Sequence, residues 1–261
     1  AVRVVQRDVV LADVAQQVAA GAEHITFGDP DFFNGPGHAM RIVRALHARF
    51  PHVTYDVTIK VEHLLRHRDR LAELRETGCL FVTSAAEAVD DAILERLDKG
   101  HTREDFVLAV HLARRAGLRV QPTFVPFTPW TTVAGYVDLL DTVAELDLVG
   151  DVAPVQYAIR LLVPAGSRLL ELPEMGALVG EFDERALSHH WEHRDPAVDR
   201  LQRDVLRIVG HQQRHGSARG AVFETVRAWA LQAHGVTRDG PEPRGWAHAG
   251  AGPHLSEPWF C

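Results

Sequence analysis

The sequence is poor in cysteine, and this scarcity excludes two kinds of structure. Its 261 residues include only Cys79 and Cys261, so a framework of several disulfides cannot form. Two thiolates also rule out a four-iron cluster held by three thiolates within this chain. We expect Cys79, at the start of a buried strand, to be an inert core residue. The terminal Cys261 is expected to be exposed and is the better candidate for redox or substrate chemistry.

Long apolar runs and basic runs are also missing. No stretch reaches the roughly 20 apolar residues of a membrane span, and the N-terminus lacks the apolar core of a signal peptide. The net charge is -7, and without a lysine- or arginine-rich run the chain has no surface suited to a phosphate backbone. The sequence therefore predicts a cytoplasmic protein that binds neither nucleic acid nor a membrane.

Phosphate-binding loops are absent too, since neither G-x-G-x-x-G nor G-x-x-x-x-G-K-S/T occurs. What is present is an alternation of apolar strands, starting near positions 24, 53, 79, 118 and 153, with helical stripes. This order predicts a parallel sheet covered by helices, and the missing loops favour a barrel over a doubly wound sheet. The predicted fold class is α/β, with a partial parallel (β/α) TIM-like barrel of five strands.

The pattern along the chain changes twice. Residues 1–172 carry the strand and helix units, whereas residues 173–235 have apolar side chains at helical spacing. Residues 236–261 are rich in glycine, proline and histidine and have little periodicity. We therefore predict a partial barrel over 1–172, a helical extension over 173–235 and a loose tail over 236–261.

Several helix ends carry local signals. Asp8 is placed to cap a first helix and Gly21 to end it, because Leu11, Val14 and Val18 between them share one helix face. The run Thr102-Arg103-Glu104-Asp105 resembles a capping box that opens a later helix.

Polar side chains follow each predicted strand. Ligands of parallel α/β proteins gather at the carboxyl ends of strands, so we expect these residues to converge on one cleft. The residues at these ends are Gly28, Asp29, Pro30 and Asp31, then Thr58 and Lys60, then Thr83, Ser84 and Glu87, then Thr123, and finally Tyr157 and Arg160.

Three segments resemble the radical S-adenosylmethionine (SAM) enzymes. The run from His24 to Pro30 looks like the strand and the glycine-glycine-glutamate-proline turn that holds the amino group of SAM, although Phe27 and Asp29 replace the second glycine and the glutamate. The run from Phe81 to Glu87, followed by Leu94–Thr102, is similar to a strand-to-helix segment of cobalamin-type and methylthiotransferase-type members. The runs Tyr157–Leu161 and Pro164–Leu170 resemble the last barrel strand and its following turn. The resemblance covers about residues 8–172.

This resemblance implies an enzyme that uses a 4Fe-4S cluster for reductive cleavage of SAM to a 5′-deoxyadenosyl radical. It implies that Asp29, beside Gly28 and Pro30, binds the amino group of SAM. Ser84 or Thr58 would meet the ribose hydroxyls, Lys60 or Arg160 would face the carboxylate, and Glu87 would lie among the cofactor contacts. An electron donor for the cluster and an unidentified small-molecule or peptide substrate would be the partners.

The two ends of the chain suggest that it is a fragment. The chain starts at Ala1 rather than at methionine and runs directly into Val2-Arg3-Val4-Val5, so we expect the cluster-bearing first strand and its cysteines to lie upstream. The segment Leu255–Cys261 resembles the approach to a tail that ends in two cysteines, or cysteine and selenocysteine, followed by Ala-Glu-Pro. By itself, the chain is expected to be inactive.

Other interpretations stay open at this point. The chain is an iron-independent (β/α) barrel enzyme if Asp29, Glu87 and Lys60 act as acid, base and electrostatic groups, or a cluster-less barrel that binds a small molecule or a protein. Asp29 and Asp31 are also suited to shape a turn with Gly28 and Pro30. The histidines of His189-His190-Trp191-Glu192-His193 invite a metal site on one helix face, but a solvated histidine-rich surface is the more economical interpretation, and we predict no metal ligand in the chain.

Overall fold

A computed structural model of the chain describes residues 4–235, 245–246 and 253. The described residues form two compact units. The first comprises 4–86, 104–122 and 253, and the second comprises 87–103, 123–235 and 245–246. Each unit is described by itself below.

The first unit is built on a parallel sheet. Its strands are β1 (His24–Thr26), β2 (Thr54–Thr58), β3 (Cys79–Glu87) and β4 (Arg119–Phe124), in the order β1-β2-β3-β4. Strands β1 and β2, and likewise β2 and β3, pair in parallel, with Thr26 opposite Asp56 and Thr58 opposite Thr83. The predicted parallel α/β architecture and its first four strands are therefore confirmed.

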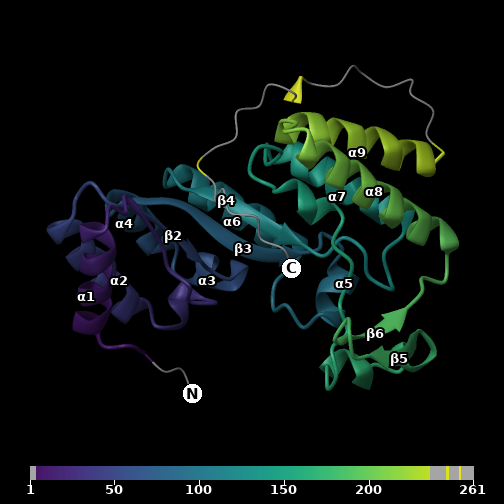
Figure 1. Cartoon of the computed structure of the whole chain (residues 1–261), viewed down its shortest axis with the longest axis horizontal. Coiled ribbons are helices and arrows are strands. Elements are labelled where there is room, and N and C mark those ends of the chain that lie inside the picture. The colour runs from purple at the N-terminus through teal and green to yellow at the C-terminus, as the bar shows by residue number, and fades with distance from the viewer. Residues whose placement is uncertain (1–3, 236–244, 247–252, 254–261) are drawn as a thin grey trace. The chain divides into compact units, whose positions relative to one another are not determined.

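Helices connect these strands. They are α1 (Arg7–Ala19), α2 (Pro36–Arg49), α3 (Val61–Arg66), α4 (Leu71–Glu76) and α6 (Arg103–Arg115), with 3-10 turns η1 (Phe32–Asn34) and η2 (Arg68–Arg70). Helices α1 and α2 lie side by side (Figure 1). Gly21 follows α1 with a φ of +101°, as a terminating glycine should. The predicted cap is wrong, because Gln6 is the N-cap and Asp8 lies in the first turn, where its carboxylate still favours the helix dipole.

The two faces of the sheet differ in burial. Tyr55, Val57 and Val82 are fully buried, whereas Thr58 and Thr83, which alternate with Val57 and Val82, are half-buried. Alternate residues of a strand point to opposite faces, so one face belongs to the apolar core and the other is partly open. Cys79 is buried at the start of β3, as predicted.

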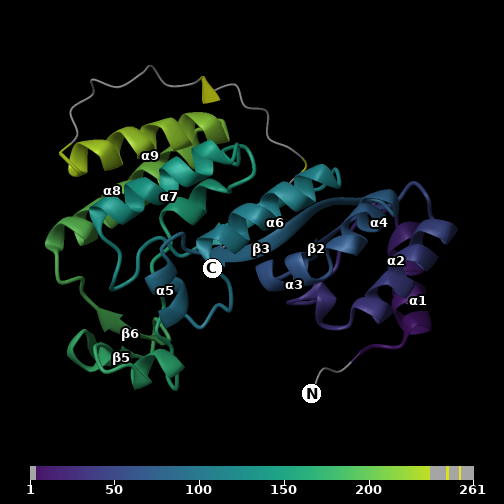
Figure 2. The ribbon, with the colours of Figure 1, turned by 180° about the vertical axis from the view of Figure 1, so that it is seen from behind.

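The second unit is mainly helical. It contains α5 (Asp91–Arg96), α7 (Val133–Glu145), α8 (Pro196–Arg214) and α9 (Arg219–Ala233), the 3-10 turns η3 (Pro154–Tyr157), η4 (Arg168–Glu171) and η5 (Met175–Ala177), and an antiparallel hairpin of β5 (Val179–Asp183) and β6 (Ser188–Trp191). Helices α7, α8 and α9 pack against one another (Figures 1 and 2).

Two predictions about this unit need correction. The fifth strand, expected to start near position 153, is wrong, because the 3-10 turn η3 begins there and a single parallel bridge joins Arg160 to Phe127. A side chain takes part in the local bonding, since Gln156 accepts a hydrogen bond from the Phe124 backbone N–H at 2.8 Å. The range predicted to be helical from 173 onward contains the β5–β6 hairpin before its helices. The described sheet of four parallel strands does not amount to a closed barrel.

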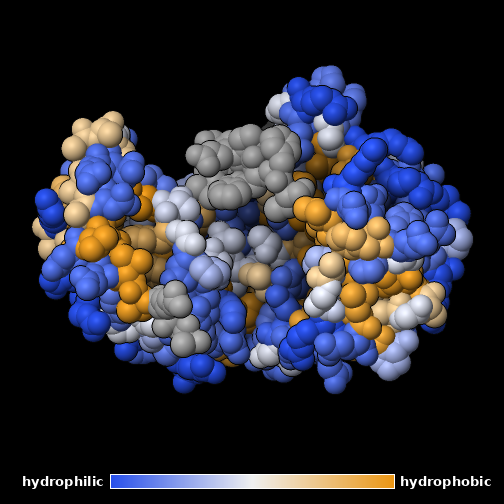
Figure 3. Space-filling model, turned by 60° about the horizontal axis from the view of Figure 1, so that its bottom comes forward, coloured by the Kyte–Doolittle hydropathy of each residue, from blue (hydrophilic) through white to orange (hydrophobic). Residues whose placement is uncertain are grey.

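The surface matches the composition. On the face in Figure 3, polar residues predominate and apolar residues form separate patches. None of the helices in the described ranges is both long and apolar enough to cross a bilayer.

Candidate functional site

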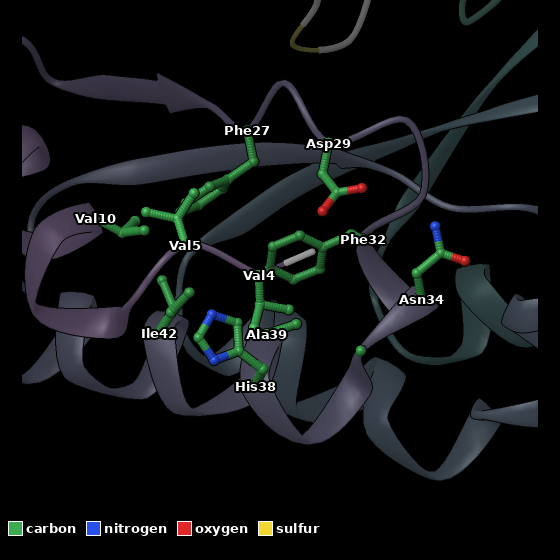
Figure 4. A pocket seen from close by; sticks show the side chains of 11 residues that line it. Val4, Val5, Val10, Phe27, Asp29, Phe32, Asn34, His38, Ala39 and Ile42 are labelled. Carbon is green, nitrogen blue, oxygen red and sulfur yellow. The ribbon is translucent and has the colours of Figure 1, made fainter. Parts of the chain in front are cut away.

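A small pocket opens beside the end of β1 in the first unit. Its volume is about 160 Å³, and it lies between the segment before α1, the turn after β1 and α2. Most of its lining is apolar, and Asp29 is its one carboxylate (Figure 4). His38 and Asn34 supply further polar groups at the rim. The lining residues are Val4, Val5, Val10, Phe27, Asp29, Phe32, Asn34, Gly35, His38, Ala39 and Ile42.

The turn after β1 is organised by two aspartates. The Asp29 carboxylate accepts a hydrogen bond from the Asp31 backbone N–H at 3.0 Å, which is the turn-shaping role anticipated for these residues. Asp31 is 1% exposed, and its second contact is with the His63 ring, whose Nδ1 lies 2.7 Å from Oδ2. Asp29 is exposed, so it alone of the two is available to a ligand.

Gly28 and Pro30 flank Asp29 and are exposed as well. No atom lies within 4 Å of the position that a Cβ on Gly28 would take, and its φ is not in the left-handed range. Glycine is therefore not sterically required here in the structure as it stands, and the space beside the backbone is open.

The end of β2 lies at the same edge of the sheet as the turn after β1. The Lys60 backbone N–H approaches Asp31 Oδ1 at 3.4 Å, which ties the loop after β2 to the turn after β1. The Lys60 side chain is exposed and Thr58 is half-buried. Ser84 differs, because it is fully buried and its hydroxyl donates to the Ile59 carbonyl at 2.7 Å.

A polar cluster that sequence reasoning missed lies on the half-open face of the sheet. The Asp56 side chain on β2 is 3% exposed, and its Oδ1 accepts from the Thr26 hydroxyl at 2.7 Å and from His24 Nε2 at 3.0 Å. His24 Nδ1 lies 2.8 Å from the Thr54 hydroxyl. A polar residue at every second position of two neighbouring strands was the available signal.

A second ionisable cluster lies at the beginning of α3. His63 contacts Asp31 on one side, and Arg66 Nη1 lies 3.3 Å from its Nε2. The His67 ring lies 5.8 Å from the His63 ring, centroid to centroid. Burial, followed by the charge of His63, lowers the pKa of His67. The histidines are thus part of the packing around the Asp31 turn.

Glu87 belongs to the second unit. It ends β3 with a φ of +64°, a left-handed conformation that is uncommon for a residue with a side chain. Its carboxylate pairs with Lys99 Nζ at 2.8 Å, and its carbonyl accepts from the Val125 backbone N–H at 2.9 Å. Such backbone strain is concentrated at functional sites in proteins.

Arg160, also in the second unit, has structural partners. Its guanidinium donates to Asp199 Oδ1 at 2.7 Å and to the Trp191 carbonyl at 2.6 Å. The same group lies 3.5 Å from the centroid of the Trp191 ring. These contacts join the segment after η3 to β6 and α8.

The predicted site residues therefore divide between the units. Gly28, Asp29, Pro30, Thr58, Lys60 and Ser84 lie at one edge of the sheet in the first unit, and Glu87 and Arg160 lie in the second. The convergence of all eight on a single cleft stays a prediction.

Cys79 does not suit an iron–sulfur cluster. Burial, with a smaller contribution from the Asp56 carboxylate, raises the pKa of its thiol well above the ordinary range, and the thiol donates to the Phe81 carbonyl at 3.3 Å. A cluster needs thiolates, so the donors present in the described ranges do not fit it. Cys261 lies outside the described residues.

The histidine run near residue 190 is not on a helix. His189 and His190 lie in β6, so the helix face needed by the less favoured metal-site interpretation does not exist. His189 Nδ1 donates to the Gly180 carbonyl at 3.0 Å across the hairpin. The described residues contain no group of three or more His, Cys, Asp or Glu arranged to hold a metal ion.

Solved structures that match the chain include those of radical SAM enzymes. The cobalamin-dependent S-adenosylmethionine radical enzyme OxsB, with aqua-cobalamin and S-adenosylmethionine bound, has a TM-score of 0.69 and 14% identity, over 89% of this chain and 42% of that one. The same enzyme with aqua-cobalamin bound has a TM-score of 0.65 and 14% identity, over 77% of this chain and 37% of that one. The radical S-adenosylmethionine methyltransferase TsrM from Kitasatospora setae has a TM-score of 0.45 and 19% identity, over 54% of this chain and 27% of that one.

At this identity, the likeness to OxsB shows a shared fold. The chain spans about two fifths of the length of OxsB, 37% to 42% in the two structures. No curated protein matches the chain. The family model of the Radical SAM superfamily matches residues 1–140, more than half of the 261 residues. Together with the parallel sheet and the polar residues at its carboxyl edge, this match identifies the chain as a member of the radical SAM superfamily.

Proposed function

We propose that the protein binds S-adenosylmethionine at the carboxyl edge of β1 and β2, as part of a radical SAM enzyme. The observation that carries this proposal is the exposed Asp29 carboxylate at a pocket with no other carboxylate, directly after β1. SAM presents a cationic amino group on a short apolar chain. A carboxylate beside apolar walls suits that group, because charge-assisted hydrogen bonds are roughly twice as strong as neutral ones.

The neighbouring residues extend this assignment. In the proposal, Thr58 offers a hydroxyl to the ribose and Lys60 offers its ammonium to the SAM carboxylate. Ser84 would need to give up its bond to the Ile59 carbonyl to reach a ligand, so its proposed role is to fix the end of β2 that carries Thr58. Glu87 and Arg160 remain proposed cofactor residues, and the strained backbone of Glu87 supports its inclusion.

The cluster is proposed to depend on thiolates from outside these 261 residues. The chain has two cysteines, and the buried thiol of Cys79 is unsuited to bind iron. Family membership supports a reaction that begins with reductive cleavage of SAM, with an external electron donor, on a substrate not yet identified. The loss of an upstream strand is also part of the proposal, as is the resemblance of Leu255–Cys261 to a cysteine or selenocysteine tail. Neither of these adds a residue to the site.

Calorimetric titration of SAM into the purified chain tests the proposal. Asp29→Ala removes the carboxylate and is expected to weaken binding by about 1.5 to 3 kcal/mol, roughly 10- to 150-fold. Asp13→Ala is the matched control, because Asp13 is an exposed carboxylate on α1 that lies outside the pocket lining. Equal SAM affinity of the wild type and Asp29→Ala would remove Asp29 from the site. No measurable binding to the wild type would contradict the proposed function.

A further inference from the structure

The turn after β1 is joined to the loop after β2 by Asp31, a buried carboxylate that is 1% exposed. The Asp31 backbone N–H donates to the Asp29 carboxylate at 3.0 Å. Asp31 Oδ1 accepts from the Lys60 backbone N–H at 3.4 Å. Asp29 and Lys60 are the two residues proposed to hold the charged groups of SAM, so both are attached to the same buried side chain.

The other oxygen of Asp31 faces a histidine. His63 Nδ1 lies 2.7 Å from Asp31 Oδ2, and the His63 side chain is 11% exposed. The contact departs from ideal hydrogen-bond alignment, and neither atom has a hydrogen-bond partner elsewhere in the described residues. A carboxylate withdrawn from water needs compensating contacts, and the bond from Lys60 is a long one. Asp31 therefore depends mainly on His63.

The neighbours of His63 determine which ring nitrogen carries the hydrogen. Arg66 Nη1 lies 3.3 Å from Nε2, and a guanidinium can only donate. Glu62 Oε1 is 3.8 Å from Nε2, beyond the range of a hydrogen bond, and the His67 ring lies 5.8 Å from the His63 ring, centroid to centroid. Nε2 is thus the acceptor of the ring, which places the hydrogen of the neutral imidazole on Nδ1, towards Asp31.

The shape of SAM explains why the link through Asp31 matters. SAM carries its amino and carboxylate groups on one carbon atom, so the two protein charges that bind them must keep a fixed separation. Asp29 lies in the turn after β1, whereas Lys60 lies directly before α3. Groups on separate segments bind well only when other residues hold them in place.

We propose that Asp31 and His63 are positioning residues of the SAM site. His63 holds the Asp31 carboxylate through its Nδ1–H, and Asp31 sets the distance between Asp29 and Lys60. The inference rests on the proposed function, because it concerns the same ligand. It adds a role for two residues that lie behind the ligand contacts.

Calorimetric titration of SAM into the full chain tests the inference with variants of His63. His63→Leu keeps an apolar side chain of moderate size and removes the donor, and it is expected to weaken SAM binding on the order of tenfold, as for a lost hydrogen bond to a charged group. His63→Asn places an amide donor near the position of Nδ1 and should stay within about threefold of the wild type. His52→Leu, at an exposed histidine before β2, is the matched control and should bind SAM as the wild type does.

Two further measurements separate positioning from a general effect on folding. His63→Gln carries its amide near the position of Nε2 rather than Nδ1, so it should show the same loss as His63→Leu, and it replaces that variant if His63→Leu does not fold. The probe 5′-methylthioadenosine lacks the amino acid end of SAM. It should bind the wild type and the His63 variants equally, because the proposed role concerns only the residues that face that end.

The outcomes distinguish this inference from the proposed function. The inference alone is overturned if folded His63→Leu or His63→Gln binds SAM as the wild type does, if His63→Asn loses as much affinity as they do, or if the variants weaken SAM and 5′-methylthioadenosine alike. Both proposals fail if the wild type does not bind SAM or if Asp29→Ala binds it unchanged.

Discussion

Two buried tyrosines in the second unit differ in whether their hydroxyl groups have a hydrogen-bond partner. The Tyr136 hydroxyl donates to the Tyr157 carbonyl at 2.8 Å, whereas the Tyr157 hydroxyl has no hydrogen-bond partner among the described residues. Burial raises the pKa of both phenols well above the ordinary value, so both keep their proton throughout the neutral range. The two side chains therefore form a natural pair for measuring what a buried hydroxyl contributes.

Replacing each tyrosine by phenylalanine should have different effects on stability. Tyr136→Phe leaves a buried carbonyl without its donor and is expected to lower the free energy of unfolding by about 1 to 2 kcal/mol. Tyr157→Phe removes an unpaired hydroxyl and is expected to be neutral within about 0.5 kcal/mol, or stabilising. Urea denaturation followed by circular dichroism measures both. A loss for Tyr157→Phe as large as that for Tyr136→Phe would show that its hydroxyl has a partner, such as an ordered water.

At the scale of single elements, α5 shows how a short helix is fixed by its first residue. The Asp90 side chain accepts from the backbone N–H groups of Ala92 at 2.8 Å and of Ile93 at 3.3 Å. The helix itself spans Asp91–Arg96, too short to persist without tertiary packing and a cap.

Removal of this cap should have a local effect on α5. Asp90→Ala is expected to cost about 1 kcal/mol, and Asp90→Asn only a few tenths, because asparagine caps nearly as well. Hydrogen exchange at the amides of Ala92 and Ile93 should accelerate in Asp90→Ala and stay close to wild type in Asp90→Asn. Equal protection in both variants would assign the stability of α5 to packing alone.

The same elements explain what the sequence could and could not predict. The first four strands contain buried or half-buried apolar residues between turn signals, with polar residues alternating in β1 and β2, and this pattern identified them. The fifth run looked similar, but it begins at Pro154 and forms η3, a difference that apolar content does not encode. The β5–β6 hairpin was not predicted, because four of the five residues of β5 are exposed. A strand without a buried face shows no alternation of apolar and polar residues in the sequence.

Local sequence could place some residues of the candidate site and could not place others. Asp29 and Lys60 follow strands directly, and the carboxyl ends of parallel strands share an edge, so local sequence was enough. Asp56 pairs with His24 across 32 positions of sequence, a separation that only the register of β1 and β2 determines. The partners of Arg160, Trp191 and Asp199, are likewise distant in sequence, so its contacts within the protein could not be predicted.

At the scale of the whole molecule, iron chemistry provides the plainest test. The chain made as written is expected to assemble no stoichiometric four-iron cluster, because it has two cysteines and the buried thiol of Cys79 stays protonated. Anaerobic incubation with iron and sulfide, followed by iron analysis and absorbance, measures the cluster. An assay for 5′-deoxyadenosine under dithionite measures SAM cleavage. A stoichiometric cluster with product formation would show that the chain holds enough ligands by itself.

The two units are interleaved along the chain, and this has a consequence for how such a protein can be divided. The polypeptide passes from one unit to the other between residues 86 and 87, 103 and 104, and 122 and 123, and it returns to the first unit before residue 253. No single cut of the backbone yields a piece that contains one complete unit alone. Exchange of one contiguous gene segment would therefore not transfer either unit whole.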